Sequence, residues 1–142
     1  EGIREAFAAA RAQSTTPLAA LHEALRILTA PIASPEALSN NLAFLQLDLT
    51  DDDFHEQALA HADALVEELW VLLEEAVSQG QLVATDTSRL AEAVYVTYNG
   101  ALVAWPIRRT GSLADALRDA VEFLLQPYAP ASDAARVGGP VA

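Results

Sequence analysis

Apolar residues recur along this chain at spacings of three and four positions, which is the period of an α-helix. Between residues 17 and 29, for example, leucines stand at positions 18, 21, 25 and 28. Runs in which apolar and polar residues alternate, as they do along a half-buried strand, are missing. Ala and Leu are abundant, and both residue types favour helices. The pattern therefore predicts an all-α chain.

Residues that typically begin and end helices divide the chain into about six segments. An N-cap side chain accepts hydrogen bonds from the unpaired N–H groups of the first turn, and five residues stand in such positions: Thr16, Ser34, Asp51, Asp86 and Ser112. Gly80 is typical of the residue that follows a helix, and Pro127 stops the last one. The predicted helices cover residues 2–13, 17–29, 34–49, 52–79, 86–108 and 112–126, which indicates a multi-helix bundle.

The helix predicted over 52–79 has two adjacent apolar stripes and only a narrow polar face. So wide an apolar arc is typical of a helix that is packed on several sides. We interpret this helix as the spine of the domain.

The last two predicted helices carry more apolar surface than one domain needs, which suggests self-association. Gly100 stands inside the first of them, where it costs about 1 kcal/mol relative to Ala, and this suggests the close approach of another backbone. The residues expected at an interface between two copies are Leu90, Val94, Gly100, Ala101, Trp105, Leu113, Leu117, Val121 and Leu124.

Composition and charge exclude several classes of function. The chain has 142 residues, 52% of them hydrophobic, and a net charge of −12, with no Cys. It can bury a real core, but it has no disulfides or thiolate metal sites, and its acidity argues against contact with nucleic acid or an anionic membrane. Its longest clean apolar stretch, residues 100–107, is far shorter than the ~20 residues of a membrane span. No signal peptide is evident, so we expect a cytoplasmic location. Met is missing even at position 1, so we expect a piece of a longer protein.

Motifs for catalysis or metal binding mostly fail. The hydrolase, P-loop and dinucleotide motifs are absent, and the pairs His22-Glu23 and His55-Glu56 lack the second His of a zinc site. The acidic run 51–53 could hold a hard cation, but carboxylates also favour the start of a helix. We expect no catalytic residues, no metal and no cofactor.

Aromatic residues are the better indication of function. Large aromatics with a few polar tips are what a small-molecule cavity in a helical bundle uses, although plain core packing would also explain them. An amide on an apolar helix face needs a partner, which could be a ligand. The candidate ligand-binding residues are Phe44, Trp70, Tyr95, Tyr98 and Asn99.

The order of these parts is familiar. The spine helix ends in AVSQGQL over 76–82; LAEAV over 90–94 and YNGAL over 98–102 follow, and then a final amphipathic helix before Pro127. This order resembles the C-terminal ligand-binding and dimerisation domain of the tetracycline-repressor (TetR) family of bacterial transcription regulators.

The resemblance implies that residues 1–127 form an effector-binding and dimerisation domain, with 1–13 as a connecting helix and 128–142 as a flexible tail. Operator DNA would be bound by an N-terminal helix-turn-helix domain, of which this sequence contains no trace. The last two helices would pair with their copies in a four-helix homodimer interface. A small apolar or aromatic ligand would bind among the spine helix, the helix before it and the Gly100 helix, and would change the spacing of the DNA-binding domains, most often in a repressor. The alternative is a helical protein–protein interaction module without a ligand cavity.

Overall fold

Residues 2–131, which the computed structural model describes, fold into six α-helices and two short 3₁₀ turns, with no strand in that range. The helices are α1 (Gly2–Gln13), α2 (Pro17–Thr29), α3 (Pro35–Thr50), α4 (Asp52–Ser78), α5 (Thr87–Arg108) and α6 (Leu113–Leu125), and the turns are η1 (Ala30–Ile32) and η2 (Gln126–Tyr128). Within these residues, the side chains at positions 44, 47 and 48 are not described. The prediction of an all-α bundle of about six helices is confirmed.

Local chemistry sets the helix boundaries where the sequence predicts them. The Thr16 Oγ1 atom accepts a hydrogen bond from the Ala19 N–H at 3.2 Å, and Asp51 Oδ1 accepts one from the Asp53 N–H at 3.0 Å. The side chains of the other three predicted N-cap residues, Ser34, Asp86 and Ser112, accept equivalent bonds at 3.1 Å. Each cap of this kind stabilises its helix by about 1 kcal/mol.

The end of α4 is closed by Gly80, which adopts a φ of +79°. The Gln81 N–H donates to the Ala76 carbonyl at 2.8 Å and the Gly80 N–H donates to the Val77 carbonyl at 3.1 Å. These two bonds make the Schellman ending of a helix, whose left-handed residue is usually Gly. The predicted role of Gly80 is therefore confirmed.

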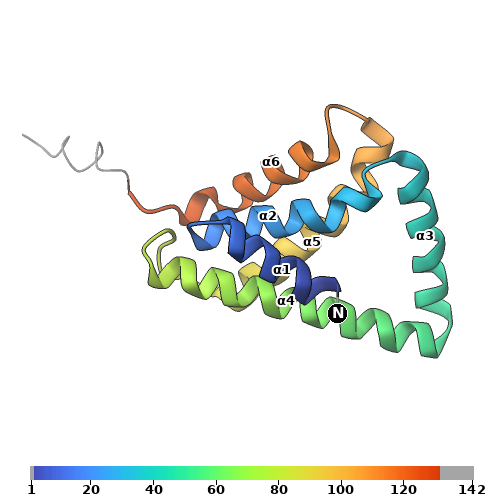
Figure 1. Ribbon diagram of the computed structural model, residues 1–142, viewed down its shortest axis with the longest axis horizontal. Coiled ribbons are helices and arrows are strands. Elements are labelled where there is room, and N and C mark those ends of the chain that lie inside the picture. Colours follow the sequence, from blue (N-terminus) through green and yellow to red (C-terminus); the bar gives the residue numbers. More distant parts are fainter. Residues whose placement is uncertain (1, 132–142) are drawn as a thin grey trace, which may run out of the picture.

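Helix α4 is the central element of the bundle (Figure 1). It packs against α1, α2, α3 and α5, and α6 packs on α5 and α2. Leu69, Leu72 and Leu73 of α4 are completely buried. Helix α3 runs across one end of the bundle, from the end of α2 to the start of α4 (Figure 1). The interpretation of α4 as a helix packed on several sides is confirmed.

Helix α1 contributes one face to the same core. Ile3 and Phe7 are 2% and 0% exposed, and they belong to the buried cluster formed with α2 and α4. At the edge of this contact, the Arg11 Nη1 atom lies 2.8 Å from Glu75 Oε2. The helix is thus held against the bundle both by apolar packing and by an ion pair.

The chain after α6 is more ordered at its start than the sequence suggests. The predicted tail begins at residue 128, but Tyr128 ends the turn η2 and packs against the core. Its carbonyl accepts a hydrogen bond from the Val83 N–H at 2.8 Å. The prediction of a flexible tail is wrong for Tyr128, and residues 132–142 lie outside the described part of the chain.

Five of the residues predicted at a dimer interface are part of the chain's own core. These residues are 0–5% exposed: Leu90, Val94, Leu113, Leu117 and Val121. Their side chains are not available to a second copy, and this part of the interface prediction is wrong. The apolar stripe of α6 faces α2 and α5 instead of the outside. Gly100, Ala101, Trp105 and Leu124 keep some exposed surface.

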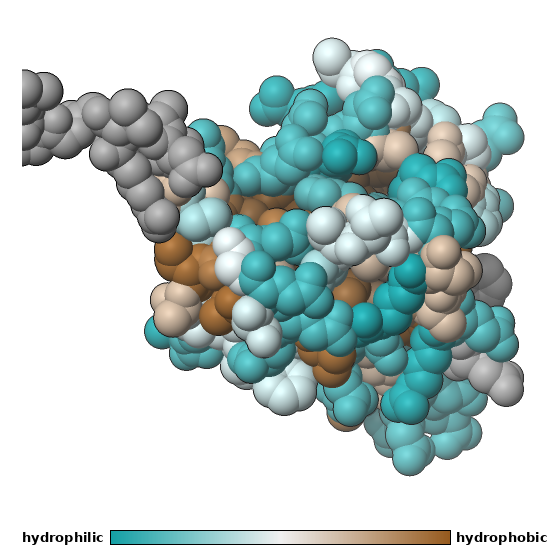
Figure 2. Space-filling view, turned by 60° about the vertical axis from the view of Figure 1, so that its left-hand side comes forward, coloured by the Kyte–Doolittle hydropathy of each residue, from teal (hydrophilic) through white to brown (hydrophobic). Residues whose placement is uncertain are grey.

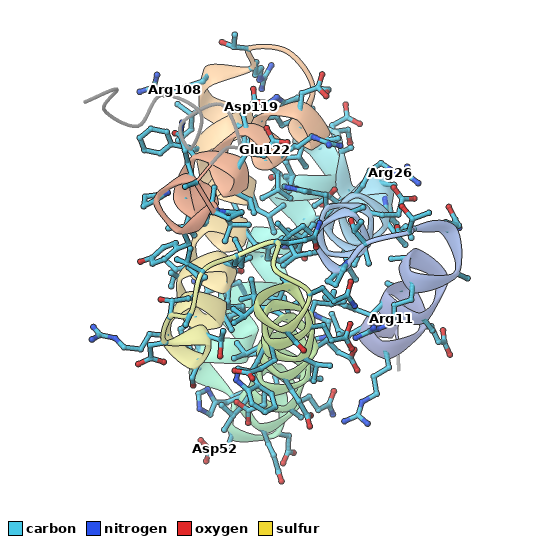
Figure 3. The ribbon with its side chains drawn as sticks, turned by 90° about the vertical axis from the view of Figure 1, so that its left-hand side faces the viewer. Arg11, Arg26, Asp52, Arg108, Asp119 and Glu122 are labelled. Carbon is cyan, nitrogen blue, oxygen red and sulfur yellow. The ribbon has the colours of Figure 1, made fainter. Side chains whose placement is uncertain are left out.

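The outside of the bundle carries the charge. The side chains labelled in Figure 3 lie around its periphery: Arg11, Arg26, Asp52, Arg108, Asp119 and Glu122. Within residues 2–131, no helix combines the length and the apolar character that crossing a membrane requires.

Candidate functional site

A cavity lies between α3, α4 and α5, near the start of α4. It is partly open to solvent and has a volume of about 420 Å³. Its lining residues are Ile32, Asn41, Leu45, Gln57, Ala58, His61, Ala62, Leu65, Tyr95, Tyr98, Asn99 and Leu102. Its surface is somewhat more polar than apolar: amides, one imidazole and two phenols supply the polar groups, and aliphatic side chains and two tyrosine rings supply the apolar part. This mixture is typical of small-molecule sites.

Helical periodicity brings these residues together. On α5, Tyr95, Tyr98, Asn99 and Leu102 are three or four positions apart and therefore share one face. On α4, the lining residues recur over two turns from position 57 to position 65. On α3, two lining residues, at positions 41 and 45, are one turn apart. Three helical faces thus converge on one space.

Tyr98 is the most deeply buried of the polar residues that line the cavity. It is only 8% exposed, and burial raises the pKa of its phenol above the ordinary value of 10.0, with a smaller contribution from Tyr95. The phenol therefore stays protonated, and remains a hydrogen-bond donor, at neutral pH. No hydrogen bond joins its hydroxyl to another residue whose side chain is described, and within that part of the chain no buried side-chain oxygen or nitrogen lacks a partner. The hydroxyl therefore has access to the cavity that its side chain lines.

Asn99 satisfies part of its hydrogen-bonding capacity within its own helix. Its Nδ2 atom donates to the Tyr95 carbonyl at 2.9 Å, and the residue is exposed at the cavity mouth. One of the two N–H donors of this amide therefore has its partner within the helix. Its Oδ1 atom remains an acceptor for a bound molecule.

Two of the five predicted ligand-binding residues are not found at the cavity. Trp70 is 41% exposed and does not line it, because it lies more than one turn beyond Leu65, the last lining residue of α4. The structure therefore does not bring Trp70 to this cavity. The side chain of Phe44 lies outside what the structure describes, although its neighbour Leu45 lines the cavity. Tyr95, Tyr98 and Asn99 do come together there.

Sequence reasoning missed the polar residues that α3 and α4 contribute. Asn41, Gln57 and His61 line the cavity, but polar residues on amphipathic helices are normally assigned to the solvent face. One signal could have found two of them: Gln57 and His61 are four apart, next to Ala58 and Ala62 of the apolar stripe. Small apolar residues beside them leave room for a ligand.

A second hollow, with a mostly apolar surface, lies on the outside between α5 and α6. It is about 480 Å³ in volume, and small residues form much of it: Gly100, Ala101, Ala104, Ala116 and Ala120. Trp105 closes one side, with its Nε1 donating to the Gly111 carbonyl at 3.1 Å. A Cβ atom built on Gly100 would meet nothing within 4 Å. The close backbone approach expected at Gly100 therefore does not occur among the described residues of this chain.

Large apolar side chains are exposed on the same two helices. Val103, Ile107 and Phe123 are 45%, 79% and 78% exposed. Figure 2 shows on one face of the molecule that hydrophobic side chains reach the surface in patches between hydrophilic ones. The two helices that form the hollow thus also carry exposed apolar side chains.

A smaller pocket between α2 and α6 contains His22. Burial, and then the charge of Arg118, lower the pKa of this imidazole, while Glu122 acts in the opposite direction. The arginines here already have acidic partners: Arg26 with Glu23 at 2.7 Å, and Arg118 with Glu122 at 3.1 Å. The pocket therefore offers no excess positive charge to a ligand.

Within residues 2–131, no three His, Asp or Glu side chains are placed to share a metal ion. The described lining of the cavity includes no carboxylate, serine or arginine. The amide, imidazole and phenol groups of the cavity can form hydrogen bonds with a small molecule. In comparisons with known proteins, no protein-family model, curated protein or solved structure matches this chain.

Proposed function

We propose that this chain is the effector-sensing and dimerisation domain of a TetR-like transcriptional regulator, most simply a repressor. One observation carries the proposal: the cavity is built from α3, α4 and α5. These are the helix before the spine, the spine helix and the Gly100 helix, the three regions in which the resemblance implies a ligand site. The bound molecule is a small apolar or aromatic compound, and the domain is a binding domain, not an enzyme.

The homodimer forms through the outer faces of α5 and α6. The apolar hollow between these helices, the open side of Gly100 and the exposed Phe123 support this assignment. Small residues allow two helix pairs to approach closely. Operator DNA is bound by a helix-turn-helix domain outside this sequence, and the protein acts in the cytoplasm.

Helix α5 borders both the cavity and the apolar hollow. Tyr98 lies on its cavity side, whereas Gly100 and Ala101 lie on the side of the hollow. A ligand that binds one position of α5 better than another therefore also favours one arrangement of the dimer. Ligand binding thereby changes the spacing of the DNA-binding domains through a single helix.

The cavity can be tested with an apolar fluorescent probe, N-phenylnaphthylamine. Ala62→Leu adds three carbon atoms to the cavity wall, whereas Ala60→Leu adds the same atoms at an exposed position of the same helix. We expect the wild-type chain and Ala60→Leu to bind the probe equally, and Ala62→Leu to bind it about tenfold more weakly, a difference of about 1.4 kcal/mol. Equal binding by both variants would refute this site, and a wild-type chain that binds neither this probe nor the two neutral probes described below would refute the ligand cavity.

The regulator itself is tested by the coding sequence upstream of Glu1. The proposal requires a basic helix-turn-helix of about 45–50 residues there, the size of a three-helix DNA-binding unit. A different upstream domain would favour the second candidate, a helical interaction module. The observation in favour of that module is the apolar hollow between α5 and α6, which could equally receive another protein.

A further inference from the structure

We propose that the Tyr98 hydroxyl anchors the ligand by donating a hydrogen bond, and that the ligand is an uncharged aromatic molecule with a carbonyl acceptor. This inference rests on the proposed ligand-binding function and adds to it the chemical class of the ligand. It is carried by the combination of a deeply buried phenol and a cavity that this phenol borders.

The Tyr98 hydroxyl can donate a hydrogen bond to a molecule in the cavity. The side chain is more than nine-tenths buried, and its hydroxyl has no hydrogen-bond partner among the described residues. A polar group in this situation loses free energy unless a bound molecule or water completes its hydrogen bond. Burial also keeps the phenol protonated by raising its pKa, so the group it selects is an acceptor.

The neighbouring Tyr95 is a weaker candidate for this role. It is only half-buried, so water can solvate its hydroxyl in the empty cavity. A hydrogen bond from a ligand to Tyr95 would replace one to water with little net gain. The Tyr98 hydroxyl has less access to water and therefore discriminates more strongly between ligands with and without an acceptor.

The rest of the lining selects an uncharged, flat molecule. Leu45, Leu65 and Leu102 provide apolar surface, and the two tyrosine rings provide aromatic surface for stacking. The described polar groups other than the phenols are amides and one imidazole. A charged ligand would leave water without an opposite charge among these residues, which is strongly unfavourable.

The test compares two neutral fluorescent probes with the same aromatic ring system. Prodan is a dimethylaminonaphthalene with a ketone, and dimethylaminonaphthalene itself lacks this acceptor. The variant Tyr98→Phe removes only the hydroxyl, and Tyr128→Phe is the matched control at a tyrosine that does not line the cavity. Dissociation constants come from fluorescence titration, and circular dichroism checks that both variants are folded.

We expect Tyr98→Phe to weaken prodan binding about three- to tenfold, the range of one hydrogen bond, and to leave dimethylaminonaphthalene binding unchanged. Bound prodan should also emit at shorter wavelength in this variant, because a hydrogen bond to its ketone shifts the emission to longer wavelength. Tyr128→Phe should change neither quantity.

Three outcomes would overturn the inference. Equal weakening of both probes would mean that Tyr98 acts by packing, and no weakening of either would mean that its hydroxyl does not contact the ligand. If N-phenylnaphthylamine binds the wild-type chain but prodan does not, the ligand class is wrong while the proposed function stands. If none of the three probes binds, the proposed function fails as well.

Discussion

The contact of α1 with the rest of the bundle leads to a prediction about stability. Phe7 is 0% exposed and lies in the core cluster with side chains of α2 and α4. If α1 were only a connector to another domain, truncating this side chain would cost little. The variant Phe7→Ala therefore measures whether α1 is an integral part of this fold.

The expected cost follows from complete burial. Phe→Ala substitutions in packed cores destabilise by about 3–5 kcal/mol, because the side chain's transfer free energy is lost and a cavity remains. With a urea dependence of about 2 kcal/mol per molar, a loss of about 3 kcal/mol lowers the unfolding midpoint by roughly 1.5 M. Such a loss is a large part of the 5–15 kcal/mol typical of a domain.

The measurement is urea unfolding of the 142-residue chain, followed by far-ultraviolet circular dichroism. Phe54→Ala is the matched control, because Phe54 is 42% exposed on α4, away from the proposed dimer face, and its loss should cost much less than that of Phe7. A midpoint for Phe7→Ala within 0.3 M or so of the wild type, at an unchanged slope, would show that α1 does not pack as described.

Two further predictions concern pH and association. Because burial lowers the pKa of His22 below its ordinary value of 6.5, the unfolded chain takes up a proton before the folded chain does, and stability falls as the pH drops below about 6.5. In thermal melts at pH 7 and pH 5, His22→Gln should lose less stability between the two pH values than the wild type does. An equal loss in the two proteins would contradict this account. The control is His55→Gln, at an exposed histidine. The second prediction places a carboxylate in the hollow between α5 and α6: in sedimentation experiments, Ala104→Glu should dissociate the homodimer, while Ala60→Glu, with the same added charge on α4, should not. A monomeric wild-type chain at micromolar concentration would refute the dimer.

Helix boundaries could be predicted from the sequence because they depend on neighbouring residues. The side chains of Thr16 and Ser112 cap helices by bonding N–H groups three residues away, and Gly80 ends α4 through bonds within the same turn. Such interactions are complete within a few positions of the chain. The sequence pattern therefore contained the information that decides them.

Neighbouring residues do not show whether an apolar stripe packs in the chain's own core or against a second copy, so the sequence could not predict this. Leu117 and Val121 form an apolar stripe that suits either a core or a dimer interface, and in the structure they face the core. Trp70 and Tyr98 both lie on helices that adjoin, but only Tyr98 is at the level of the cavity. Periodicity gives the direction of a side chain about its helix axis, whereas the height at which two helices meet depends on the whole fold.

The two walls of the cavity differ in how firmly they are attached. Among the described side chains of α3, only Leu38 is buried, and Leu42 and Leu45 are 38% and 44% exposed. The opposite wall, α4, has five buried residues in the centre of the bundle. Of these five, only Leu65 borders the cavity, and the other residues of α4 that line it are exposed or half-buried. Helix α4 is therefore anchored in the core beyond the cavity, whereas α3 is attached by little buried surface along its whole described length.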